Sequence, residues 1–291
     1  MIYLFVSIVC STAIYAIFSL FSKYKIYTFQ AIVVNYFVAS GFGFWYTISS
    51  GGGNYTLNEP WLINAGIVGV LFISLFYVMA ITSQRHGVTV TGIATKMSMV
   101  IPVFFFLITD PDETWHWAKL AGIALGIVAV LLTTLSGKKQ SKISLAALTP
   151  VVLFVGSGLL DLFLALTEKN YLTTDIAYTD FVPAPFGIAA TIGTIILIYR
   201  GIVHKSRLKI KNIVAGIILG LVNYGSIYFL LKILGSGLID RSAAIPANNM
   251  GVVALSAIVG VLLFKEKLRA RKLWGILLAL VAIALLTLLS P

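Results

Sequence analysis

Two ionisable side chains stand far inside long apolar segments of this sequence. Lys96 lies within GIATKMSMVIP, and Asp161 lies within GSGLLDLFLAL. A charged side chain at the centre of a membrane-spanning helix costs about 3 kcal/mol on insertion scales, so each needs a partner or a hydrated cavity. As a pair they could bind a zwitterionic or hydroxylated molecule, and the Asp161 carboxylate could also take up a proton. Alternatively, Lys96 extends toward nearby headgroups, and Asp161 belongs to a fixed polar contact between helices.

A second candidate binding segment is RSAAIPANNMGVV, which combines a proline with two amides. Pro246 has no backbone N–H, so it should leave a carbonyl free near Asn248 and Asn249. Free carbonyls and amides near the middle of a membrane span are typical of substrate sites in carriers. The alternative is that these amides only join neighbouring helices, which is how we interpret Asn35 and Asn223.

Aromatic residues complete the candidate binding set, and no group predicts a metal or a cofactor. Tyr15, Tyr77 and Tyr228 could offer ring faces to a bound molecule, although tyrosines also collect at membrane interfaces. Cys10 is the sole cysteine. The histidines lie in predicted loops without the spacing of metal ligands, and no catalytic motif is present. They are His86, His116 and His204. We therefore expect no enzyme, no metal and no cofactor.

The elements that carry these residues must be membrane-spanning helices. Hydrophobic residues make up 59% of the 291 residues and charged residues only 11%, against about 45–50% and 25% in soluble domains. Ten apolar segments without the alternation of barrel strands predict ten α-helices. The segments are residues 3–22, 29–48, 61–82, 89–108, 118–135, 148–167, 178–199, 212–231, 242–264 and 272–289.

Charged residues divide between alternate links of these helices. Basic residues follow the odd-numbered segments: Lys23, Lys25, Arg85, Lys138, Lys139, Lys142, Arg200, Lys205, Arg207, Lys209, Lys211, Lys265, Lys267, Arg269, Arg271 and Lys272. Acidic residues collect after the even-numbered ones: Glu59, Asp110, Asp112, Glu113, Glu168, Asp175, Asp180 and Asp240. The positive-inside rule predicts that the basic links face the cytoplasm and that both termini face outside. The net charge of +11 therefore reflects topology and not nucleic-acid binding, in a multi-pass protein of the cell membrane, the bacterial inner membrane being the expected one.

An internal repeat divides the chain into two halves. The segment that begins at Glu113, ETWHWAKLAGIALGIVAVLLTTL, aligns without gaps on the segment that begins at Glu266, EKLRARKLWGILLALVAIALLTLL. Five helices per half is an odd number, so the halves should cross the membrane in opposite directions. We expect a first half over residues 1–137, a basic cytoplasmic linker over 138–147 and a second half over 148–291. Small faces for close helix packing are predicted at Gly66 with Gly69, Gly122 with Gly126, and Gly216 with Gly220.

This pattern resembles the paired EamA-type repeats of the drug/metabolite transporter superfamily. The resemblance rests on two halves that each end in an apolar helix, a link containing Glu, and a last helix that opens Lys-Leu-x-Gly-Ile. It implies ten helices around a central cavity, lined mainly by the first, third and fourth helices of each half. It also implies a secondary transporter that moves a small polar metabolite by alternating access. An amino acid or related compound is the expected substrate, with export the favoured direction.

Coupling, assembly and function stay open on the sequence alone. Protons are the candidate coupling ion, and the chain could act as a monomer or a homodimer in the lipid bilayer. The alternative function is a membrane-embedded enzyme for a lipid or prenyl substrate, which would usually need clustered carboxylates, histidines or a metal on one membrane face. A passive channel is a third class, and it fits an inverted repeat less well.

Overall fold

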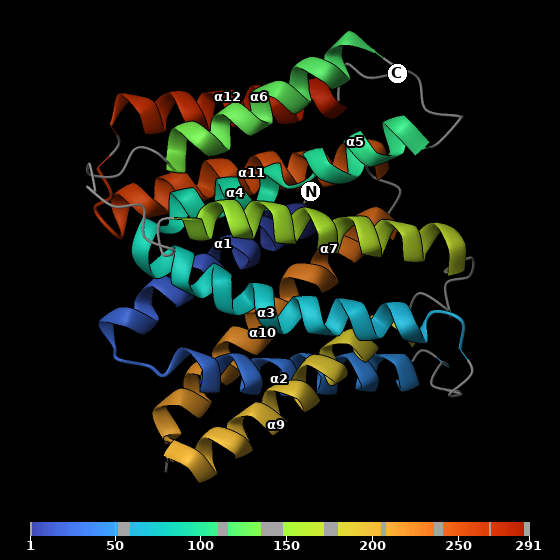
Figure 1. Cartoon of the computed structure of the whole chain (residues 1–291), viewed down its shortest axis with the longest axis vertical. Helices are drawn as coiled ribbons and strands as arrows, with labels where there is room; N and C mark the ends of the chain where they lie inside the picture. Colours follow the sequence, from blue (N-terminus) through green and yellow to red (C-terminus); the bar gives the residue numbers. More distant parts are fainter. Residues whose placement is uncertain are drawn as a thin grey trace. The chain divides into compact units, whose positions relative to one another are not determined.

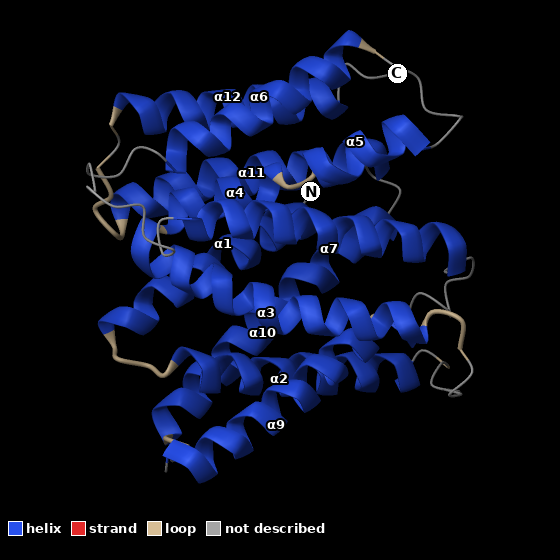
Figure 2. Ribbon diagram, in the orientation of Figure 1, coloured by secondary structure: helices blue, strands red, loops and turns tan. Residues whose placement is uncertain are grey.

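The computed structural model describes residues 2–49, 51, 59–109, 116–134, 148–171, 180–204, 208–235, 241–267 and 269–287. Within these ranges the regular elements are helices, as Figures 1 and 2 show, which confirms the all-α prediction. In chain order they are α1 (Ile2–Lys23), α2 (Thr28–Ser49), α3 (Leu62–His86), α4 (Val88–Met97), α5 (Val100–Thr109), α6 (Trp117–Thr134), α7 (Thr149–Tyr171), α9 (Pro183–His204), α10 (Ile210–Gly235), α11 (Arg241–Leu262) and α12 (Ala270–Thr287).

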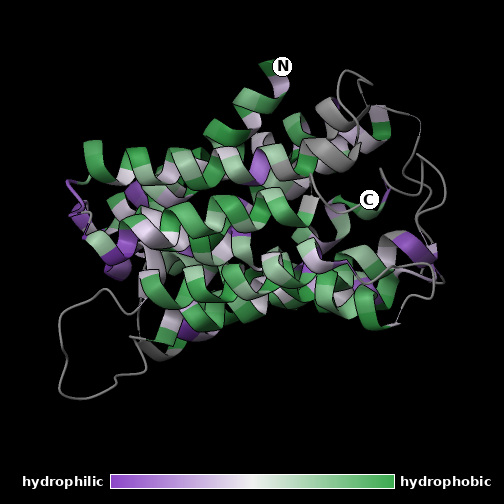
Figure 3. Ribbon diagram, turned by 90° about the horizontal axis from the view of Figure 1, so that it is seen from above, coloured by the Kyte–Doolittle hydropathy of each residue, from purple (hydrophilic) through white to green (hydrophobic). Residues whose placement is uncertain are grey.

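The helices have the length and composition of membrane spans. Eight helices of the described chain are long and apolar enough to cross a bilayer, counting α4 and α5 together over Val88–Thr109. A shorter apolar helical stretch covers Ala247–Leu262. Figure 3 shows hydrophobic residues along the helices, with hydrophilic residues mostly near helix ends. These are the features of a multi-pass membrane protein.

The fourth predicted segment is interrupted, whereas we expected one helix over residues 89–108. Pro102 cannot donate to the carbonyl of Ser98 four residues earlier, and that carbonyl instead accepts the Ile101 N–H at 2.9 Å. The backbone therefore turns at Ser98 and Met99, between α4 and α5. In contrast, α11 continues as one helix through Pro246.

The described helices form two compact units. The first unit comprises residues 1–20, 78–161 and 225–291, and the second comprises 21–77 and 162–224. Helices α1, α3, α7 and α10 contribute residues to both units. A buried apolar cluster of the first unit joins α4, α6, α11 and α12 through residues such as Ile93, Ala129, Val253 and Ala279.

Within the first unit, α6 and α12 pack antiparallel through a reciprocal pair of glycines. A Cβ atom on Gly122 would lie 2.6 Å from Leu286 and 3.1 Å from the Ala282 carbonyl oxygen. A Cβ atom on Gly275 would overlap Thr133 and lie 3.1 Å from the Ala129 carbonyl oxygen. The alignment that pairs Gly122 with Gly275 also pairs Leu286 with Thr133 and Ala282 with Ala129. The same contact is thus made twice, once from each copy of the repeated segment.

Within the second unit, α2 packs against both α9 and α10. Gly216 and Gly220 let the backbone of α10 approach α2, since Cβ atoms there would lie 2.6 and 2.9 Å from carbonyl oxygens of α2. Asn223 donates to Asn35 Oδ1 at 3.2 Å, so these amides join helices as predicted. Gly69 is also closely packed, against Ile188. The prediction for Gly66 is wrong, because nothing lies within 4 Å of a Cβ atom added there.

Candidate functional site

Polar side chains of the first unit gather where α4 ends. Ser98 Oγ lies 2.6 Å from the Thr95 carbonyl oxygen and 3.0 Å from Asp161 Oδ2. A hydroxyl has one hydrogen, so Ser98 can donate to only one of these acceptors at a time. Gly158, one turn before Asp161 on α7, is packed so tightly on Ile101 that a Cβ atom would overlap it. This close approach of α7 to α5 is what brings the Asp161 carboxylate to Ser98.

Tyr15 on α1 belongs to the same group. Its side chain forms a hydrogen bond with Thr95 and also experiences the charge of Asp161. Thr95 Oγ1 donates to the Thr91 carbonyl at 2.8 Å, which leaves the oxygen free to accept from the tyrosine hydroxyl. The residue is only 3% exposed, and its ring passes close to Gly92.

The two predicted charges are near each other but do not touch. Lys96 and Asp161 are half-buried, and each experiences the charge of the other. Lys272 and Glu266 form an ion pair at 3.2 Å, whereas Lys96 and Asp161, both described, do not form one within 4.0 Å. Two opposite charges that are near one another without forming an ion pair could each pair with an opposite charge of a bound molecule.

Of the two predicted amides of α11, Asn249 contacts the turn between α4 and α5, and Asn248 is its neighbour in the chain. Asn249 is 8% exposed, and its Nδ2 approaches Met99 Sδ at 3.6 Å. Asn248 is 1% exposed, and its Oδ1 has no hydrogen-bond partner within the described structure. An unpaired buried acceptor costs about 1–3 kcal/mol, so Asn248 has an unused capacity to bind a donor.

We call Tyr15, Thr95, Lys96, Ser98, Asp161, Asn248 and Asn249 the polar cluster. The two other predicted tyrosines are placed differently. Tyr77 belongs to the second unit, is 39% exposed and meets Phe29 edge-on, with ring centroids 6.0 Å apart. Tyr228 on α10 belongs to the first unit, and Lys232 Nζ lies 5.5 Å from its ring centroid.

Sequence reasoning missed Thr95 and Ser98 as members of the site. Both lie within three residues of Lys96, and Pro102 stands four residues after Ser98. A hydroxyl residue four positions before a proline inside an apolar segment was the available signal, since the backbone there loses a regular hydrogen bond. No group of three or more metal-binding side chains occurs in the described part of the chain. The cluster offers donors, acceptors, one cation and one carboxylate, which suit reversible binding of a polar molecule.

Comparisons with known proteins support the fold. No family model matches the chain. An uncharacterized protein of Haemophilus influenzae is 26% identical over 284 residues, covering 95% of this chain and 94% of that protein. A protein of known crystal structure is 14% identical, with a TM-score of 0.63 over 99% of this chain and 96% of the solved one. The chain therefore shares its fold with a solved protein over nearly its whole length.

Proposed function

We propose that this chain is a secondary transporter that moves a small polar metabolite across the cell membrane by alternating access. The polar cluster is the proposed binding site. The observation that carries the proposal is that its groups are buried or half-buried and incompletely paired, as in Asn248 Oδ1 and the separated charges of Lys96 and Asp161. Unpaired polar groups inside a membrane are costly, and such groups usually serve a ligand or an ion pathway.

The arrangement of opposite charges favours an amino acid or a related zwitterion as substrate. Its carboxylate would pair with Lys96, and its ammonium group would pair with Asp161 and donate to Asn248. These contacts would give Lys96 an ion pair, Asp161 an opposite charge in addition to its contact with Ser98, and Asn248 Oδ1 a donor. Export is the favoured direction, and protons are the candidate coupling ion, because Asp161 could carry one.

The inverted-repeat architecture of the proposal is supported by the helix packing. Within the described residues, the helices are compatible with five per half when α4 and α5 are counted as one interrupted span. The reciprocal contacts of Gly122 and Gly275 are those expected of two halves related by a two-fold axis in the membrane plane. We propose on this basis that the chain is a drug/metabolite transporter of the EamA type, acting as a monomer or a homodimer.

Counterflow in proteoliposomes tests the proposal. Vesicles loaded with an unlabelled mixture of amino acids should accumulate each labelled amino acid that is a substrate, and Asp161→Asn protein should not. Asn35→Ala protein is the matched control, because Asn35 is a buried polar residue of the second unit that pairs with Asn223. Leakage without counterflow would indicate a channel. If amino acids, sugars and nucleotide derivatives all gave no counterflow and no leakage, the carrier would be rejected. The membrane-embedded enzyme would then be the remaining alternative.

A further inference from the structure

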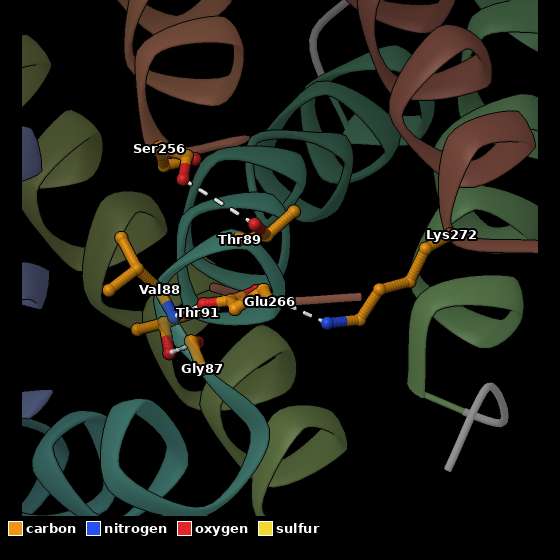
Figure 4. Close-up of polar contacts among 7 residues, drawn as sticks. All are labelled: Gly87, Val88, Thr89, Thr91, Ser256, Glu266 and Lys272. Atoms are coloured by element: carbon orange, nitrogen blue, oxygen red, sulfur yellow. Dashed lines mark hydrogen bonds and ion pairs between the residues drawn. The ribbon is translucent and has the colours of Figure 1, made fainter. Parts of the chain in front are cut away.

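The start of α4 is held by a carboxylate from the link between α11 and α12. Glu266 Oε1 accepts the backbone N–H of Val88 at 2.7 Å, as Figure 4 shows. The first N–H groups of a helix lack partners within the helix and are usually capped by the residue just before it. Here that residue is Gly87, which has no side chain. Glu266 provides the missing cap, and its charge is favourable at a helix N-terminus.

The other carboxylate oxygen of Glu266 ties the cap to α12. Oε2 lies 3.2 Å from Lys272 Nζ in the first turn of α12, and the two side chains are only 10% and 14% exposed. The Glu266 backbone N–H also donates to the Gly260 carbonyl of α11 at 2.9 Å. One residue thus joins the start of α4, the end of α11 and the start of α12.

Glycines make room for this arrangement. Gly87 has φ +94°, where L side chains are strained, and a Cβ atom there would overlap the Glu266 carboxylate. A Cβ atom on Gly260 would lie 2.5 Å from Thr89 Oγ1 and 2.9 Å from the Glu266 carboxyl carbon. No larger residue fits at either position while Glu266 caps α4.

The contact between α4 and α11, which we call the α4–α11 seam, differs between its ends. At the Glu266 end, Thr89 Oγ1 donates to the Ser256 carbonyl at 3.4 Å, and a Cβ atom on Gly92 would overlap Ser256. Thr89 and Ser256 are completely buried there. At the opposite end lie the weak contact of Asn249 with Met99 and the unpaired oxygen of Asn248. The seam is closely packed and hydrogen-bonded beside Glu266, and its polar groups are incompletely paired beside the proposed binding site.

We propose that Glu266 is a positioning residue that keeps its end of the α4–α11 seam closed, and that opening this end to water requires its release from Val88. Because Lys96 and Ser98 lie on and just after α4, the same cap sets where the two side chains stand. The importance of this step for transport rests on the proposed function. The closed seam itself is a property of the fold and can be tested without any substrate.

Cysteine accessibility tests the proposal. In a Cys10→Ser background, Thr89→Cys places a reporter of similar size in the closed end of the seam, where Thr89 meets Ser256. Protein in nanodiscs is labelled with a membrane-impermeant maleimide, which reaches both faces. Glu266→Gln keeps the shape of the cap but removes its charge and the pair with Lys272, so the reporter should label about tenfold faster. Lys267→Gln, the exposed neighbour in the same link, should leave the rate unchanged.

Two outcomes would overturn the proposal. The first is an equal rate in the Glu266→Gln and Lys267→Gln proteins. The second is faster labelling in Glu266→Gln protein at both Thr89→Cys and Thr12→Cys, since Thr12 is a 2% exposed residue of α1 and its reporter detects general loosening. The labelling result is independent of counterflow. If Glu266→Gln raised the labelling rate tenfold but the unchanged protein showed no counterflow, the role of Glu266 in the seam would stand and only the proposed transport function would be rejected.

Discussion

The side chains of the polar cluster have more hydrogen-bonding capacity than they use among themselves. Ser98 has one hydrogen for two nearby acceptors, and Asn248 Oδ1 has no donor. A protonated Asp161 would resolve the first conflict, because it could donate to Ser98 while Ser98 donates to Thr95. A bound ammonium group would resolve the second. Proton and substrate would thus be taken up by neighbouring groups of one site.

The first prediction concerns the coupling of Lys96 and Asp161. Their charges interact without contact, so the coupling free energy should be about 1–2 kcal/mol, below the 3–5 kcal/mol lost when one partner of a tight buried pair is removed. A double-mutant cycle of Lys96→Met and Asp161→Asn measures it from the unfolding of each variant in detergent. The double mutant should recover part of the stability lost by the single mutants but remain inactive in uptake. Strictly additive losses would show that the charges do not interact.

The second prediction separates binding amides from packing amides. Asn248→Ala should change the melting temperature little, because the stability gained by removing an unpaired acceptor offsets the stability lost to the space that the side chain leaves. Substrate affinity should fall at least tenfold. Asn249→Ala should behave similarly, since its contact with Met99 is weak.

Asn223→Ala is the control for these amide variants. It leaves Asn35 Oδ1 without its donor, so it should lower the free energy of unfolding by about 1–3 kcal/mol. Thermal melting and ligand-induced stabilisation are measured on the same purified proteins. Unchanged substrate affinity in both Asn248→Ala and Asn249→Ala protein would leave these residues as packing groups.

At the scale of the element, helix positions followed directly from apolar length, and the interruption between α4 and α5 did not. The bounds of α1, α2 and α6 lie within one residue of the predicted segments, because a bilayer fixes how many apolar residues a span needs. Pro102 and Pro246 look alike in the sequence, but only Pro102 coincides with a broken helix. Tertiary packing decides whether a helix tolerates a proline, and a single sequence does not contain that information.

The third prediction concerns the glycines of α6 and α12. Since a Cβ atom would clash at either position, Gly122→Ala and Gly275→Ala should each destabilise the protein by about 1–3 kcal/mol. The two losses should be similar because the contacts are reciprocal. Gly66→Ala is the matched control, and it should be neutral or slightly stabilising, since nothing lies within 4 Å. A loss confined to one of Gly122 and Gly275 would contradict the equivalence of the two helices.

At the scale of the whole molecule, contacts within each unit join the basic links that the sequence predicts to lie on one side of the membrane. In the second unit, Lys211 Nζ donates to the Lys25 carbonyl at 2.7 Å, and Arg200 donates to the Tyr27 hydroxyl at 2.9 Å. In the first unit, Glu266 joins its basic link to the α3–α4 link, which follows Arg85. Each contact connects two links that the sequence assigned to the cytoplasm. The repeated segment predicted the α6–α12 equivalence, whereas Glu113, its first residue, lies outside the described residues.

The last prediction is that the basic links face the cytoplasm and both termini face outside. Translocation of segments rich in Lys and Arg is disfavoured, so the side with the basic links should remain cytoplasmic. Single cysteines in a Cys10→Ser background test this at Ser141 and Asn54, which lie outside the described residues, and at Lys267, an exposed residue of the α11–α12 link. In intact cells an impermeant maleimide should label position 54 alone, whereas broken cells should expose all three. Labelling of positions 141 and 267 with protection of 54 would reverse the orientation, and Glu266 would then close the external face. Labelling of 141 but not 267 in intact cells would place two predicted cytoplasmic links on opposite sides, which is incompatible with the ten-span inverted repeat.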